Sequence, residues 1–62
     1  SAMLVECCGD LLSIAFQREI WILNTTLPDF KKTIPTSDNV SSLCLQEGLL
    51  VFGTFDGQLT IF

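Results

Sequence analysis

The sequence predicts an all-β fold, an antiparallel β-meander of short strands. Runs rich in Val, Ile, Leu, Phe and Cys recur along the chain, and Gly, Asp, Asn or Pro residues separate them. This alternation is typical of strands joined by tight turns. No window of about twelve residues repeats its apolar side chains with the period of a helix. Both observations favour strands throughout.

Four strands are expected in the first part of the chain. We predict them at residues 3–8, 11–16, 20–24 and 30–34. Gly9-Asp10 is the turn pair between the first two. The fourth strand contains two lysines, which are common on edge strands because they discourage pairing with other chains. Pro35 ends this strand, because proline has no N–H to donate to a neighbouring strand.

Three further strands are expected at residues 40–46, 49–54 and 58–62. Glu47-Gly48 and Asp56-Gly57 separate them. An Asp-Gly pair between two β-prone runs predicts a two-residue type I′ turn, which needs positive φ at both central positions. The residues expected to be critical for turns are Gly9, Gly48, Asp56 and Gly57.

The length of 62 residues allows one small domain with a small core. Such a chain buries roughly 60% of the surface that its unfolded form exposes. Because 48% of the residues are hydrophobic, we expect association with a second copy or with other protein chains to cover the remainder. The expected interface residues are Trp21, Leu59, Ile61 and Phe62.

The charge of the chain argues against two classes of partner. The formal net charge is −4, and Arg18, Lys31 and Lys32 are the only basic residues. Nucleic acids and acidic membrane surfaces bind clustered Lys and Arg side chains. No apolar run approaches the roughly 18 residues of a membrane span. We therefore expect neither nucleic acid nor membrane as a partner.

Three cysteines, an odd number, do not predict a disulfide framework. Cys7 and Cys8 are adjacent, so on a strand their side chains point to opposite faces and at most one lies in a core. We interpret Cys7, Cys8 and Cys44 as reduced, buried or half-buried thiols, which favours the cytoplasm or another reducing compartment. With no His and no second Cys pair at ligand spacing, we expect no metal and no cofactor.

The two parts of the chain align as an internal repeat. Residues 5–12 align with residues 43–50, and Ile14-Ala15-Phe16 with Phe52-Gly53-Thr54. After a one-residue adjustment, Ile20-Trp21-Ile22 aligns with Leu59-Thr60-Ile61. A period of about 40 residues with four strands per unit is typical of a propeller blade.

On these residues the chain resembles the WD-repeat β-propeller family. VSSLCLQEGLLVFGTFDGQLTIF, residues 40–62, is similar to the family pattern of a strand, a Gly turn, a small-residue strand, Asp-Gly and a third strand. Ser37-Asp38-Asn39 stands where the family has Gly-His, and Leu23-Asn24 where it has Trp-Asp. The resemblance divides the chain into a blade-like unit at residues 3–39 and a truncated one at residues 40–62. Ser1-Ala2-Met3 is typical of a cloning linker.

The resemblance implies about one and three-quarter blades, whereas family members close a ring of several. A single copy is therefore expected to be incomplete and to be completed by oligomerisation. Trp21 has two interpretations: an exposed anchor for a partner, or an aromatic residue packed between blades, which we favour.

No pattern in the sequence predicts catalysis. Four of the acidic residues lie at turns, where Asp bonds its own backbone. A cysteine nucleophile needs a base, and the chain has no His. We therefore expect a protein that is not an enzyme.

Two functions remain open. The first is a blade segment of a scaffold for protein–protein interaction. The second is an engineered or truncated structural module whose only activity is self-association. A monomer that binds a foreign peptide would favour the first, and a defined homo-oligomer the second.

Overall fold

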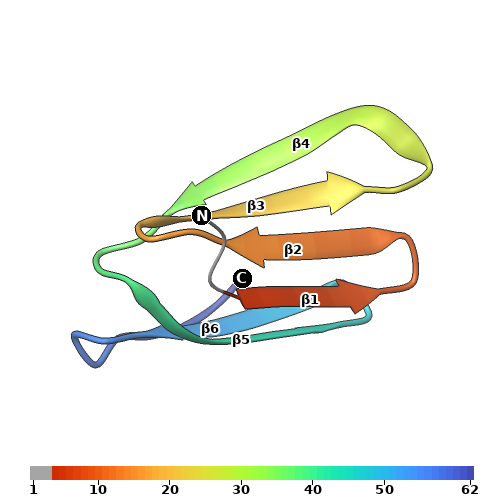
Figure 1. The fold of residues 1–62 in the computed structure, drawn as a ribbon. Coiled ribbons are helices and arrows are strands. Elements are labelled where there is room, and N and C mark those ends of the chain that lie inside the picture. Colours follow the sequence, from red (N-terminus) through yellow and green to blue (C-terminus); the bar gives the residue numbers. More distant parts are fainter. Residues whose placement is uncertain (1–3) are drawn as a thin grey trace.

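The computed structural model describes residues 4–62 and confirms the all-β class. In this part of the chain, seven strands form two antiparallel sheets and no helix occurs (Figure 1). The strands are β1 (Leu4–Cys8), β2 (Leu11–Ala15), β3 (Glu19–Asn24), β4 (Leu27–Pro35), β5 (Val40–Gln46), β6 (Leu49–Thr54) and β7 (Leu59–Ile61). The predictions for residues 1–3 lie outside the described residues.

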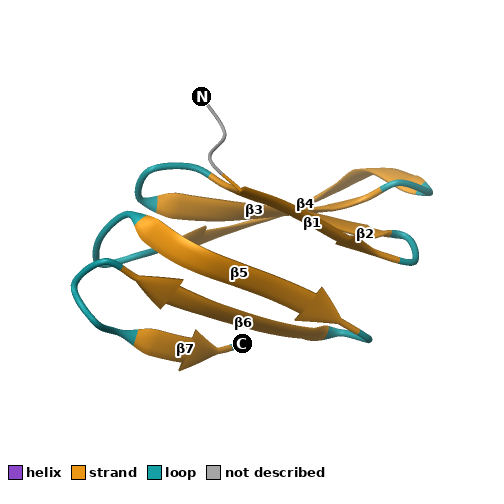
Figure 2. Ribbon diagram, turned by 60° about the horizontal axis from the view of Figure 1, so that its bottom comes forward, coloured by secondary structure: helices purple, strands orange, loops and turns teal. Residues whose placement is uncertain are grey.

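Each strand pairs with its neighbour in the chain, so both sheets are meanders. The first sheet has the order β1-β2-β3-β4 and the second β5-β6-β7. The edge position predicted for the fourth strand is confirmed, since β4 pairs only with β3 among the described strands. Figure 2 shows the sheets as two separate layers, with β1 facing β5.

Strand β4 begins at Leu27, three residues before the predicted start. Residues 25–29, between the predicted third and fourth strands, are therefore not a loop throughout, because Asn24 closes a tight turn. Its Oδ1 atom accepts hydrogen bonds from the N–H and the hydroxyl of Thr26, at 2.9 and 2.8 Å. Leu27 then pairs with Asn24, and a register shift follows before Lys31 pairs with Leu23. Pro28 lies in the shifted segment of this edge strand, where no N–H is needed.

Other strand limits differ from the predictions by one residue. β2 ends at Ala15, β3 begins at Glu19, and β7 covers Leu59–Ile61. The β6–β7 ladder nevertheless continues for one more pair. The N–H of Phe62 donates to the carbonyl of Leu50 at 2.7 Å, and the N–H of Leu50 donates to the carbonyl of Phe62 at 3.2 Å.

The type I′ turn occurs at Glu47-Gly48 rather than at Asp56-Gly57. Glu47 and Gly48 both have positive φ, 43° and 80°, and the strands pair directly before and after them. The positive φ predicted for Gly57 is confirmed at 90°, but Asp56 does not share it. The prediction of a two-residue turn at Asp56-Gly57 is therefore wrong.

Residues 55–57 form a three-residue loop. The N–H of Gly57 donates to the carbonyl of Thr54 at 3.1 Å, and the N–H of Thr54 donates to the carbonyl of Gln58 at 3.0 Å. This is the pattern of a type I turn followed by a left-handed residue. Phe55 also donates its N–H to the carbonyl of Asn39 at 3.0 Å, which ties the loop to the start of β5.

The hydrophobic core lies between the two sheets. Alternate side chains of each strand point into it, as the geometry of a strand requires. Its buried residues are Ala15, Ile20, Ile22 and Ile34 from the first sheet and Val40, Leu45, Leu50 and Phe52 from the second. Ser13 is also fully buried, and its hydroxyl lies 3.4 Å from the carbonyl of Glu6.

Only one of the three cysteines lies against this core. Cys8 is half-buried, and the N–H of Glu47 donates to its Sγ atom at 3.3 Å. Cys7 and Cys44 are exposed, so their prediction as buried or half-buried thiols is wrong. They lie at the alternate positions of β1 and β5, whose side chains point away from the core.

Candidate interaction surface

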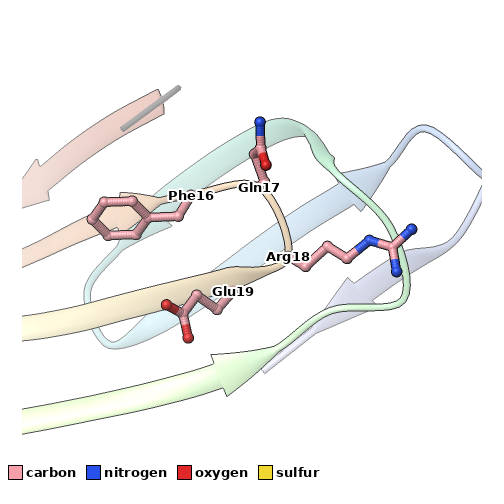
Figure 3. A pocket seen from close by; sticks show the side chains of 4 residues that line it. All are labelled: Phe16, Gln17, Arg18 and Glu19. Carbon is pink, nitrogen blue, oxygen red and sulfur yellow. The ribbon is translucent and has the colours of Figure 1, made fainter. Parts of the chain in front are cut away.

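The side chains that line the hollow at the β2–β3 turn do not converge on a common point. Phe16, Gln17, Arg18 and Glu19 line its volume of about 390 Å³. Figure 3 shows that these four side chains point in different directions. The turn is held by a backbone hydrogen bond of 2.8 Å from the N–H of Phe16 to the carbonyl of Glu19. A small molecule would meet no converging set of polar groups here.

The Asp56 carboxylate accepts hydrogen bonds from several donors. The Thr54 hydroxyl donates a hydrogen bond to its Oδ1 atom. This bond, assisted by Ser37 and by backbone N–H groups, holds the pKa of Asp56 below its usual value of 3.8. Such a carboxylate stabilises the loop at residues 55–57. Within residues 4–62, no three His, Cys, Asp or Glu side chains lie close enough together to hold a metal ion.

The second sheet presents an apolar surface on the side away from the core. We call it the β5–β7 outer face, and its apolar members are Cys44, Leu49, Val51, Leu59 and Ile61. Leu59 is 72% exposed and Ile61 is 67% exposed. Ser42, Gln46 and Gly53 complete it, so the part of this face that the structure describes carries no charge.

The first sheet has its own apolar surface, on the opposite side of the molecule. This β1–β4 outer face contains Val5, Leu12, Ile14, Phe16, Trp21 and Leu23. Val5 is exposed, whereas the other five are partly covered by one another and by neighbouring side chains. The molecule thus presents an apolar face at each end of the two-layer stack.

Trp21 lies on the β1–β4 outer face and not between the two sheets. Its neighbours in β3, Ile20 and Ile22, point into the core, so the indole points the other way. The ring packs against Phe16 in a tilted arrangement with centroids 4.6 Å apart, and Lys31 Nζ lies 3.5 Å from the centroid of the Trp21 ring. The buried Trp21 Nε1 atom finds no hydrogen-bond acceptor in the described part of the chain.

The two sheets have matching registers. Ile14 pairs with Val5 and Trp21 in the first sheet, as Phe52 pairs with Leu43 and Thr60 in the second. Two further pairs also correspond: Ser13–Ile22 with Val51–Ile61, and Ala15–Ile20 with Gly53–Leu59. The spacing between equivalent residues is 38 from β1 to β5 and from β2 to β6, and 39 from β3 to β7. Equivalent positions can therefore be compared directly.

Equivalent side chains have opposite environments in the two sheets. Ile20 and Ile22 are 0% and 9% exposed, because the second sheet covers them. Leu59 and Ile61, their equivalents, lie on the uncovered β5–β7 outer face. The same type of apolar position is thus covered by a neighbouring sheet in one half of the molecule and open in the other.

The free edges of the two sheets also differ. β4 carries Pro28, Lys31 and Lys32, which discourage further strand addition. β7 contains neither Pro nor Lys. Leu50 and Phe62 exchange both backbone hydrogen bonds, so by alternation the N–H and C=O groups of Leu59 and Ile61 point to the outer edge of β7. Among residues 4–62, no strand pairs with this edge.

The four expected interface residues do not form one patch. Leu59 and Ile61 lie together on the β5–β7 outer face, and Trp21 lies on the other outer face. Phe62 belongs to the inner side of its sheet, where Lys32 Nζ lies 4.4 Å from its ring centroid. Sequence reasoning missed Val5, Leu49 and Phe16. Their spacing relative to buried positions could have identified them, once the repeat had been used to assign faces.

Comparison with known proteins identifies no relative. The chain matches no family model, no curated protein and no solved structure. No helix in the described part of the chain is long and apolar enough to cross a membrane.

Proposed function

We propose that the chain is a non-enzymatic β-propeller blade segment derived from a scaffold for protein–protein interaction. Its binding surface is the β5–β7 outer face. The partner is a protein chain, because this surface is apolar and its described residues carry no charge. Large exposed apolar patches on soluble proteins are commonly sites of contact with other proteins.

One observation carries this proposal: the contrast between Ile20 and Ile22 and their equivalents Leu59 and Ile61. The first pair is covered by a neighbouring sheet, and the second pair is open although the register is the same. Leu59 and Ile61 thus lie on a face of the kind that is buried in the first sheet. Covering it with another protein lowers the free energy by about 25 cal/mol per Å² of apolar area buried.

A binding experiment tests the proposal. The 62-residue chain is immobilised at low density and used to select binders from a library of displayed random peptides. Peptides that bind the wild type should lose at least about tenfold in affinity for the Ile61→Lys variant, since the new ammonium group would be buried without a partner. Binding should be retained by Phe55→Lys, which changes an exposed aromatic residue in the loop beyond β6.

Two results together would overturn the proposal: no peptide whose binding depends on Ile61, and no self-association that depends on Ile61. Circular dichroism of Ile61→Lys and Phe55→Lys checks that both variants keep their strands. The second candidate function is a structural module whose only activity is self-association. The two outer faces favour it, because they are equivalent in register to the two surfaces that meet in the core.

A further inference from the structure

We propose that the β5–β7 outer face binds the β1–β4 outer face of a second copy of the chain, head to tail. This inference rests on the proposed function, since it names the partner of the same surface. It rests on the contact between the two sheets within one chain. We call this inter-sheet contact the template, because we expect the same contact to form between two copies.

The first half of the template is the side of the first sheet that faces the core. Its positions correspond in register to those of the β5–β7 outer face. The corresponding pairs are Leu11 and Leu49, Ser13 and Val51, Ala15 and Gly53, Ile20 and Leu59, and Ile22 and Ile61. Within the chain, the core-facing side of the second sheet covers these first-sheet positions.

The second half of the template is that covering surface. Its positions correspond in register to those of the β1–β4 outer face. The corresponding pairs are Leu43 and Val5, Leu50 and Leu12, Phe52 and Ile14, and Thr60 and Trp21. Each of the two outer faces is therefore equivalent to one of the two surfaces that meet in the core. The two outer faces lie at opposite ends of the stack of sheets.

Two complementary halves at opposite ends produce a heterologous contact. Copies joined by such contacts form a ring if the rotation between successive copies closes, and a filament if it does not. The β5–β7 outer face carries no charge among its described residues, whereas the β1–β4 outer face carries Lys31. The Lys31 amino group, which lies over Trp21, moves into solvent when the second copy covers the indole.

One polar contact of the template can also be transferred. Within the chain, Cys8 Sγ accepts a hydrogen bond from the N–H of Glu47. Gln46 is equivalent to Cys8, and Gly9 is equivalent to Glu47. In the assembly, the side-chain oxygen of Gln46 therefore lies opposite the N–H of Gly9 of the second copy.

A mixing experiment with two variants tests the direction of the contact. Val5→Lys alters the β1–β4 outer face, and Ile61→Lys alters the β5–β7 outer face. Sedimentation velocity should show wild-type assemblies that grow with concentration, while each variant alone stays near the monomer mass of 6.9 kDa. An equimolar mixture should form a species of two chains, because it contains one unaltered copy of each face. The matched control, Phe55→Lys, should assemble like the wild type.

Each other outcome overturns the inference. If Val5→Lys assembles alone, copies meet through like faces or through the edge of β7. If the wild type stays monomeric while peptides bind in an Ile61-dependent way, the inference fails and the proposed function survives. Emission from Trp21, the only tryptophan, provides a second measurement. In the mixture it should shift as the indole of the Ile61→Lys chain is covered, and no shift is expected when Val5→Lys is mixed with itself.

Discussion

Ile22 and Ile61 occupy equivalent positions in two sheets of matching register, yet Ile22 is 9% exposed and Ile61 is 67% exposed. Ile22 pairs with Ser13, and Ile61 pairs with Val51. The difference comes from the neighbouring layer, because the second sheet covers the first on one side and nothing in residues 4–62 covers the second sheet on the corresponding side.

Truncation of these two residues should therefore have unequal effects on the isolated chain. Ile22→Ala should lower the free energy of unfolding by about 2 to 5 kcal/mol, because it leaves a cavity between the sheets. Ile61→Ala should change it by less than about 0.5 kcal/mol in the monomer. Urea denaturation at low micromolar concentration measures both values. Equal losses would contradict the assignment of the two faces.

Gly57→Val should destabilise the loop at residues 55–57 through the backbone alone. Gly57 has a φ of 90°, and a Cβ atom added there would meet no atom within 4 Å. A β-branched residue resists positive φ, so we expect a loss on the order of 1 kcal/mol or more. Gly57→Asn should lose less, because Asn tolerates this region. Denaturation curves that superimpose on the wild type would show that φ at position 57 does not matter.

Glu47→Asn should stabilise the β5–β6 hairpin. Glu47 is the only residue other than glycine with positive φ in the described part of the chain, and it occupies the first central position of a type I′ turn. Asn-Gly is a preferred pair for this turn, so we expect a gain of about 0.5 to 1 kcal/mol in the free energy of unfolding. Asp10→Asn is the matched control, because Asp10 lacks positive φ. A similar gain at both positions would argue against a conformational cause.

Stability should fall in acid partly because of Asp56. Its pKa is lowered in the folded chain, chiefly by the hydrogen bond from Thr54. The stabilisation is therefore complete above the usual pKa of 3.8 and is lost as the pH falls from there through the lower folded pKa. Denaturation midpoints recorded from about pH 6 to about pH 2 measure this loss. Asp56→Asn should show a shallower dependence on pH, and an identical one would exclude Asp56 as its source.

Local sequence patterns were sufficient for the strands, and less so for the turns. The β-prone runs separated by Gly, Asp and Pro predicted seven strands in the right order, and two lysines predicted that β4 lies at an edge. Asp56-Gly57 was assigned the wrong turn type, because backbone hydrogen bonds from Phe55 to Asn39 and from Thr54 to Gln58 select a longer loop. Those partners lie outside the Asp-Gly pair, so the pair alone does not define the turn.

By itself, the sequence determined the strand order, the repeat and the alternation of side chains, because these depend on neighbours in the chain and on the two-residue period of a strand. Only the tertiary structure decided which side of each sheet is covered. Cys44 lies between Leu43 and Leu45 and is nevertheless exposed, and Ile61 resembles Ile22 in its local sequence but lies open. Burial depends on which layer lies opposite, and that layer comes from residues distant in the chain or from another molecule.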